Sequence, residues 1–298
     1  MPDVSVVVPT FNRAAFIEAS VTSLLTDAVD VEVLVVDDGS VDDTAVRLER
    51  LGDPRVRVLV RAHAGIAAAR NAGVAASRGR HVAFHDSDDR ALPGRLARPV
   101  AHLDAHPDVA FVVQNGRMAA REGAAAGAPW LAPATVRALR GRPLGVADVF
   151  RWNLGQLQGM CFRRTALERV GPLDGTFRIL DDLDLVLRVA VRFAGVFLDE
   201  TAFVYHPGGD SVSRDRHQIH EEAIALAEKL VREHPEALRA IGPGVFRRRQ
   251  ARRWARLAEA RHRRGDLAAA CAAMASACRL TPCDVRLRLR ARRLRRAT

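Results

Sequence analysis

Short apolar runs alternate with helical stretches along the first third of the chain. The first of them, Val4–Val8, is a continuous apolar run, which is typical of a strand that is buried on both faces. The predicted strands are Val4–Val8, Val31–Val36, Val56–Val60 and His81–Phe84. Helices are predicted between them at Ala14–Leu25, at Asp42–Leu51 with Asp42 or Asp43 as the N-cap, and at Ile66–Ala76. This alternation indicates βαβ units and a mainly parallel sheet.

Polar residues collect directly after three of these strands. They form the segments Pro9–Arg13, Asp37–Ser40 and Asp86–Asp89. In an open α/β sheet, ligands bind beyond the carboxyl ends of the strands. We therefore expect the three segments to line one binding site.

The remainder of the chain has a different pattern. Residues 100–215 form a mixed region with loop-like Gly, Ala and Pro between about 121 and 145. From residue 216 onward the sequence is helical and rich in arginine. Arg252–Arg264, a Gly-Asp turn and Leu267–Leu280 predict a helical hairpin that resembles a single tetratricopeptide-type unit.

Composition narrows the class of protein. The apolar fraction of 48% and the charged fraction of 27% are those of a globular chain. No apolar run reaches the roughly 20 residues of a membrane-spanning helix, and no basic region precedes the first strand, so we expect a cytoplasmic protein. The cysteines lack paired spacing and are expected to be buried apolar residues; they are Cys161, Cys271, Cys278 and Cys283.

The net charge of +11 raises the question of nucleic-acid binding. The excess lies in the last third of the chain and consists of arginine, since Lys229 is the only lysine. Few aromatic residues accompany it, which makes nucleic acid an unlikely partner. A basic helical tail leaves two other partners open, a second copy of the chain and an anionic membrane surface.

The acidic segment after the fourth strand carries the first chemical signal. Asp86 and Asp88 lie one residue apart in a loop and can face one hard divalent cation, Mg²⁺ or Mn²⁺, together with phosphate oxygens. The alternative is a polar turn in which Asp88 or Asp89 caps the next helix. After the second strand, an aspartate can accept hydrogen bonds from a base or a ribose.

Five segments together resemble a known family. They are VSVVVPTFNR, VLVVDDGSVDDT, AGIAAARNAGVAASRGRHVAFHDSDDR, CFRRTALERVGPLDGTFRILDDLDLVLRVA and VYHPGGDSVS. Their order and spacing over residues 3–213 are similar to those of the inverting family 2 glycosyltransferases. The resemblance implies the α/β GT-A fold, a Rossmann-like, mainly parallel mixed sheet flanked by helices, here with a C-terminal helical extension. It divides the chain into a nucleotide-sugar-binding half (1–100), an acceptor-binding half (101–215) and an arginine-rich extension (216–298).

The resemblance also implies roles in binding a nucleotide sugar, with UDP-sugar favoured over GDP- and dTDP-sugar. Thr10 and Arg13 would line the nucleotide pocket, with Phe11 near the base. Asp38 would hydrogen-bond the base, and Arg70 would approach the nucleotide. Phe11 stands where tyrosine is common in the family.

The remaining roles concern the metal and the chemistry. Asp86 and Ser87 would contact the donor, and a divalent metal would be held by Asp88 with Asp86 and His206. The pair Asp181 and Asp182 would supply the general base, with Asp182 favoured.

The implied reaction is transfer of a sugar to an acceptor nucleophile that the sequence does not identify: a small molecule, a peptide, a glycan or a lipid-linked molecule. A carboxylate base and one metal suffice for a single displacement with inversion. The alternatives are a nucleotidyltransferase, disfavoured because no glycine-rich loop follows the first strand, and a nucleic-acid-binding or scaffolding protein. Gln250–Trp254 fits the QxxRW pattern of processive synthases but is interpreted as a chance match, so we expect a non-processive enzyme.

Overall fold

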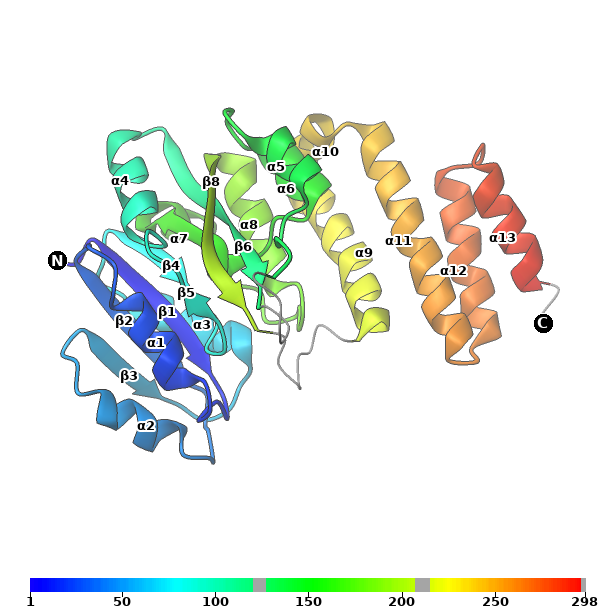
Figure 1. The fold of residues 1–298 in the computed structure, drawn as a ribbon. Coiled ribbons are helices and arrows are strands. Elements are labelled where there is room, and N and C mark those ends of the chain that lie inside the picture. The colour runs from blue at the N-terminus through cyan, green and yellow to red at the C-terminus, as the bar shows by residue number, and fades with distance from the viewer. Residues whose placement is uncertain (120–126, 207–214, 296–298) are drawn as a thin grey trace. The chain divides into compact units, whose positions relative to one another are not determined.

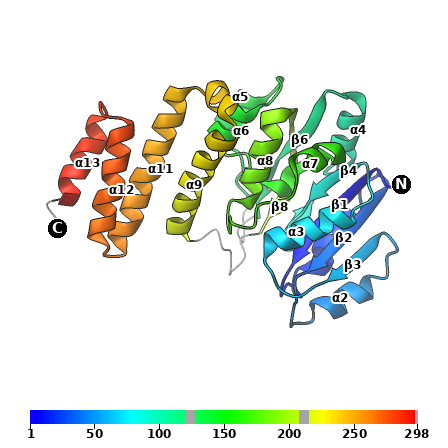
Figure 2. The same ribbon diagram turned by 180° about the vertical axis from the view of Figure 1, so that it is seen from behind.

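The computed structural model describes residues 1–119, 127–206 and 215–295. The chain forms two compact units, Met1–Asp210 and Ser211–Thr298 (Figures 1 and 2). The strands all belong to the first unit: β1 Val4–Thr10, β2 Val31–Asp37, β3 Val56–Val60, β4 His81–Phe84, β5 Arg90–Ala91, β6 Val109–Met118, β7 Met160–Arg163 and β8 Ala194–Tyr205.

Both units contain helices. Those of the first unit are α1 Ile17–Leu24, α2 Thr44–Leu51, α3 Ile66–Ala76, α4 Ala97–Ala105, α5 Pro133–Leu139, α6 Val146–Trp152, the 3₁₀ turn η1 Leu157–Gly159, α7 Arg164–Val170 and α8 Asp181–Arg192. The second unit consists of α9 Arg216–Glu233, α10 Pro235–Ile241, α11 Pro243–Arg263, α12 Leu267–Leu280 and α13 Val285–Arg295.

The strands form one mixed sheet in the order β3-β2-β1-β4-β7-β6-β8-β5. The strands β3, β2, β1 and β4 run parallel, as the alternation of strands and helices predicts. The strand β7 is antiparallel to both β4 and β6, while β6 and β8 are parallel to each other. The carboxyl ends of the first four strands therefore meet at one edge of the sheet.

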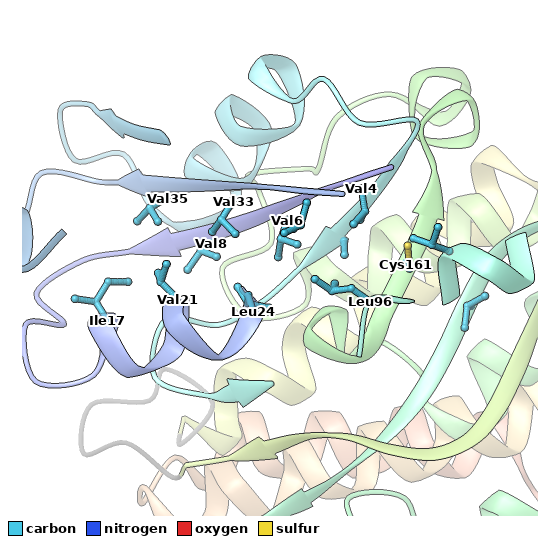
Figure 3. Packing of buried hydrophobic residues seen from close by; sticks show 14 of the residues in the cluster. Val4, Val6, Val8, Ile17, Val21, Leu24, Val33, Val35, Leu96 and Cys161 are labelled. Carbon is cyan, nitrogen blue, oxygen red and sulfur yellow. The ribbon is translucent and has the colours of Figure 1, made fainter. Parts of the chain in front are cut away.

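The first two strands have an apolar core on each face. Val4, Val6 and Val8 of β1 point to the face covered by α1 and α4 (Figure 3). On the other face α3 lies so close that a Cβ on Gly73 would be 2.3 Å from Val7 Cγ1. Burial on both faces explains why these strands are continuous apolar runs.

The second unit is built on a helical hairpin with an alanine-rich core. Ala255 and Ala258 of α11 pack with Ala273 and Ala277 of α12. Gly265 turns the chain with a φ of 82°, and Asp266 then caps α12 by accepting from the amide of Ala269. Small side chains at these positions allow the helices to approach closely. Among the described residues, no helix is both long and apolar enough to span a bilayer.

The structure corrects several boundaries. The helix predicted from Ala14 begins at Ile17, and the helix predicted from Arg252 begins at Pro243, because Pro is well placed in a first helical turn. The region predicted to be loop-like contains α5, while residues 120–126 of it lie outside the described residues. The helix predicted from Asp42 begins at Thr44, whose amide donates to Asp42.

The cysteine prediction is confirmed only in part. Cys161 is buried within the first unit, whereas Cys283 is exposed and Cys271 and Cys278 are half-buried. All four are free thiols. The predicted subdivision of the first unit near residue 100 stays a prediction.

Candidate active site

The carboxyl ends of the first three strands lie level with one another. Thr10 at the end of β1 pairs with Asp37 in β2, and Asp37 pairs with Val60 at the end of β3. On the other side of β1, the amide of His85 extends the ladder beyond β4 by donating to the carbonyl of Val7 at 3.0 Å. The polar segments that follow these strands therefore start from one edge.

Asp38 joins the end of β2 to the segment that follows β3. Its buried carboxylate accepts hydrogen bonds from the amides of Ala64 at 3.1 Å and Gly65 at 2.7 Å. The Nε of Arg61 and the Nδ1 of His63 lie 3.4 and 2.9 Å from its two oxygens. Amide and cationic donors thus surround a carboxylate at the place where the sequence predicts base recognition.

A pair of rings lies beside Asp38. The rings of Phe11 and His63 have centroids 4.4 Å apart with their planes inclined by 31°. Phe11 is 39% exposed, so an apolar surface remains open to a ligand. Next to it, Thr10 is buried, and its Oγ1 has no hydrogen-bond partner among the described residues. A flat ring with a polar edge fits these surroundings.

Arg70 connects three segments that are far apart in the sequence. It lies on α3 with its side chain only 7% exposed. One Nη is 3.0 Å from Asp181 Oδ2 and the other is 3.3 Å from Asp86 Oδ1. Burial acts to lower the pKa of Arg70, but the charges of Asp181, Asp86 and Asp182 outweigh it and raise the pKa. The arginine therefore stays charged and holds the acidic segment near the start of α8.

The two aspartates that open α8 have different surroundings. Asp181 is buried and is committed to Arg70. Asp182 is partly exposed, and one of its oxygens accepts from the amide of Leu183 at 2.6 Å. Burial and the charge of Asp181 raise the pKa of Asp182 to about 8. This value suits a group that takes a proton near neutral pH.

The acidic segment presents two carboxylates at its surface. Asp86 contacts Arg70, as described above, whereas Asp88 has one longer ion pair, 3.5 Å from the Nε of Arg13. The side chains of Asp86 and Asp88 are 28% and 20% exposed. Burial and the charge of Asp88 raise the pKa of Asp86, against the influence of Arg70. Ser87 between them is buried.

Asp89, the next residue of the acidic segment, contacts His206. The amide of His206, just after β8, donates to Asp89 Oδ1 at 2.9 Å. Asp89 is fully buried, and burial together with the charge of Asp86 raises its pKa to about 9. The other oxygen of Asp89 and the Nδ1 of His206 are buried without a partner among the described residues.

The structure does not assemble a complete metal-binding cluster. Over residues 1–119, 127–206 and 215–295, no three His, Cys, Asp or Glu side chains are grouped to hold a metal ion. Asp86 is turned toward Arg70, and His206 is tied through its backbone to Asp89. The predicted set of Asp86, Asp88 and His206 therefore stays a prediction. The closing segment after His206 lies outside the described residues at positions 207–214.

The sequence did not indicate the roles of four residues of this region. Asp89 was considered only as a helix cap, although it is the third carboxylate of one segment. Arg61 and His63 follow the third strand, whose end belongs to the same edge and offered a signal. Arg95 is fully buried in a segment without any motif.

Arg95 fixes the backbone that leads to the acidic segment. Its guanidinium donates to the carbonyls of Gln158 at 2.8 Å, Phe84 at 3.0 Å and Met160 at 2.9 Å. It also lies 3.3 Å from the Oε1 of Gln114. Since Phe84 ends β4 two residues before Asp86, these bonds tie that strand end to η1, β6 and β7.

The QxxRW segment is part of the core of the second unit. Gln250 is buried and donates to the carbonyl of Ile224 at 3.4 Å. Trp254 packs against the helical core that contains Ala255 and Ala258. Both residues thus have contacts within the second unit, and the interpretation as a chance match stays a prediction.

Comparison with known proteins gives a consistent picture. The model of glycosyl transferase family 2 matches residues 5–155. The succinoglycan biosynthesis protein ExoO of Rhizobium meliloti is 31% identical over 241 residues, which cover 77% of this chain and 68% of ExoO. The E. coli enzyme WfgD, a UDP-Glc:α-D-GlcNAc-diphosphoundecaprenol β-1,3-glucosyltransferase, is 35% identical over 102 residues, 34% of this chain and 40% of WfgD.

Two solved structures have a similar fold. TarS of S. aureus in complex with UDP has a TM-score of 0.60 at 18% identity, covering 87% of this chain and 71% of that one. The mannosyltransferase PcManGT of Pyrobaculum calidifontis, in complex with GDP-Man and Mn²⁺, has a TM-score of 0.63 at 22% identity, covering 93% and 75%. The fold is the α/β GT-A fold that the sequence predicts.

Proposed function

The chain belongs to glycosyl transferase family 2 and is a glycosyltransferase, and we propose that it transfers a sugar from a nucleoside diphosphate sugar by single displacement with inversion. The observation that carries this proposal is the position of Arg70. Its contacts with Asp86 and Asp181 bring the donor-side acidic segment beside the start of α8. A donor held by the first would therefore present its sugar to a base on the second.

We assign the nucleotide base to the surface formed by Phe11, His63 and Asp38. The exposed ring of Phe11 offers a stacking face, and Asp38 can accept from an imide N–H such as that of uracil. Binding would require Asp38 to exchange part of its present contacts with the amides of Ala64 and Gly65. The complexes of TarS with UDP and of PcManGT with GDP-Man make UDP and GDP the first nucleotides to test, with UDP favoured.

We assign the diphosphate to the acidic segment and Arg13, together with a divalent metal. Asp88 is partly exposed, and its ion pair with Arg13 is long, so its oxygens can bind a hard cation. Asp86 and His206 are the further candidate ligands, with the phosphates completing the shell. Bound there, Mn²⁺ or Mg²⁺ supplies stabilisation of the negative charge on the leaving diphosphate. The presence of Mn²⁺ in the PcManGT complex supports this assignment.

We assign the general base to Asp182. Its partly exposed carboxylate can take the proton of an acceptor hydroxyl as the oxygen attacks the anomeric carbon. The bond to the diphosphate breaks on the opposite side, which inverts the anomeric centre. Asp181 acts indirectly, since its contact with Arg70 fixes the first turn of α8. Mounting the base on a helix packed into the core keeps it rigid.

For the acceptor we favour a saccharide, free or lipid-linked, that is extended by one sugar. The names of ExoO, from succinoglycan biosynthesis, and of WfgD, which acts on a diphosphoundecaprenol-linked sugar, support this class. The structural role of Gln250 and Trp254 supports non-processive transfer.

Calorimetric titration with UDP, GDP and dTDP, with and without Mn²⁺, tests the donor site. We expect tight binding of one nucleotide that depends on the metal and is lost in Asp88→Ala. The matched control is Asp43→Ala, which removes an exposed carboxylate that makes no capping hydrogen bond. Failure of the folded protein to bind any nucleotide with Mn²⁺ present would contradict the proposal.

A further inference from the structure

The positive charge of the protein resides in the second unit. Residues 211–298 contain 22 Arg and Lys against 9 Asp and Glu, a net charge of +13. Residues 1–210 contain 24 against 26, a net charge of −2. The catalytic unit thus has no excess of positive charge, and the arginines of the second unit need another explanation.

The last helix, α13, has one buried and one exposed apolar side. Leu287 is 7% exposed and belongs to the core with Ala273 and Ala277. Val285 and Leu289 are 63% and 50% exposed. They are four residues apart and therefore lie on one face of the helix. The outer side of α13 therefore carries an aliphatic pair that the core of the second unit does not cover.

Arginines surround this aliphatic pair. Arg286, Arg288 and Arg292 are exposed, whereas Arg290 forms an ion pair with Glu259 at 3.0 Å. From Val285 to Arg295 the sequence contains six arginines and no acidic residue. Arg288 and Arg292 follow Val285 and Leu289 by three residues each, so they lie on the same side of the helix.

We propose that the outer face of α13, formed by Val285, Arg288, Leu289 and Arg292 with Arg286 at its side, binds the surface of an anionic phospholipid bilayer. A helix that combines basic residues with exposed aliphatic ones lies in the membrane interface, with the aliphatic side chains inserted and the cations at the phosphates. Arginine stems also extend along apolar surface while keeping the charge at the headgroups.

The same residues fit a nucleic acid less well. Single-stranded nucleic acids are held by aromatic side chains that stack on bases, and α13 contains none. Phosphates of a duplex would satisfy the arginines but would give Val285 and Leu289 no apolar partner. Loss of the aliphatic pair should therefore weaken binding to a bilayer but not binding to a nucleic acid.

Sedimentation with vesicles tests the charge requirement. We expect the full chain to bind vesicles of phosphatidylcholine mixed with phosphatidylglycerol far more tightly than vesicles of phosphatidylcholine alone. Replacing Arg286, Arg288 and Arg292 by Gln should weaken binding about 100-fold, since each arginine at such a surface contributes about fivefold. The control replaces three exposed arginines of the first unit, Arg50, Arg78 and Arg137, by Gln and should bind like the wild type.

Replacing Val285 and Leu289 by Ser tests insertion. This variant keeps every charge, and its binding to the anionic vesicles should fall on the order of tenfold while its binding to duplex DNA stays unchanged. Wild-type binding of this variant to vesicles, an equal effect of the control arginines, or tighter binding of DNA than of vesicles would each overturn the proposal. Nucleotide titration of the same variants separates this result from failure of the proposed function, because none of the substituted residues is among those assigned to the donor site.

Discussion

The arginines near the candidate active site differ from those of the last helix in their surroundings. In the first unit, Arg70 and Arg95 are buried, and each donates to specific oxygen atoms. What these two arginines do depends on where each one lies and not on how many arginines the unit contains. In the second unit, Arg286, Arg288 and Arg292 of α13 are exposed, and the unit as a whole has a net charge of +13. Net charge therefore says little about where catalysis occurs but much about what surface the protein meets.

The cores of the two units show a parallel difference. The first is packed from branched side chains at a period of two, such as Val4, Val6 and Val8. The second is packed from alanines at helical spacing, such as Ala251, Ala255 and Ala258. The sheet offers strand ends at which polar groups converge, while the helical unit offers long outer faces. If this contrast holds, single substitutions in the first unit should have large effects, and single substitutions of exposed residues in the second unit should have small ones.

The largest effect is expected for Asp182→Asn in the first unit. The amide keeps the shape of the side chain but cannot take a proton, so kcat should fall by about 10²- to 10⁴-fold. Nucleotide binding should persist. Because the pKa of Asp182 is raised to about 8, kcat/KM of the wild type should rise with pH up to about 8 and then level off. Measured pH profiles of the two proteins check both statements.

The companion variant Asp181→Asn separates the two carboxylates. It weakens the support of Arg70 but leaves the base in place, so the rate should fall and a pH dependence should persist. The midpoint of that pH dependence should move to lower pH, because the charge of Asp181 no longer raises the pKa of Asp182. Full activity of Asp182→Asn would exclude this residue as the base.

The second prediction concerns the stability of the first unit. Arg95→Met leaves the carbonyls of Phe84, Gln158 and Met160 without their buried donor. We expect a loss of about 2–4 kcal/mol in the free energy of unfolding. Urea denaturation measures this loss. Arg248→Met, at an exposed position in the second unit, is the control and should change stability little. Equal losses of stability in the two variants would mean that the buried Arg95 contributes no more than an exposed arginine.

The regular part of the fold could be read from the sequence because its signals are local. The strands β1 to β4 and α3 lie where the apolar pattern predicts them, although β3 at the edge of the sheet is partly exposed, unlike β1, β2 and β4. Helix starts were less predictable. The second helix of the hairpin, α12, begins where Asp266 caps it, whereas α11 begins at Pro243, nine residues before the predicted start. An amphipathic pattern specifies a helix better than it specifies its end.

The candidate site was predictable as a set of strand ends but not as a network. Arg70 and Asp181 are 111 positions apart, and only the tertiary fold brings them together. The sequence does not reveal the role of Asp89, because Asp89 differs from Asp88 in its burial and not in its spacing. Arg95 left no signal, since a lone arginine is ordinarily a surface residue and its carbonyl partners carry no sequence information.

A smaller effect is expected for Arg70→Lys. The formal charge is kept, but a single ammonium cannot reach Asp181 and Asp86 in the geometry of a guanidinium fork. We expect kcat/KM to fall about 10- to 100-fold although the net charge of the site is unchanged. Arg292→Lys on α13 is the matched control and should retain vesicle binding. If both Lys variants behaved like the wild type, charge alone would explain both units.

The smallest effect should be seen for His85→Leu, and only in acid. His85 is fully buried, and burial together with the charge of Arg95 lowers its pKa to about 3, against about 6.5 in the unfolded chain. The unfolded state therefore binds a proton more readily between these values, and the wild type loses stability as the pH falls below about 6.5. At pH 5 this loss amounts to about 2 kcal/mol.

The Leu variant lacks this titration and should unfold at nearly the same urea concentration at pH 7 and pH 5, apart from the changes common to both proteins. The exposed His262→Leu in the second unit should follow the wild type at both pH values. If His85→Leu were as acid-sensitive as the wild type, burial of a neutral imidazole beside Arg95 would not limit the stability of the first unit.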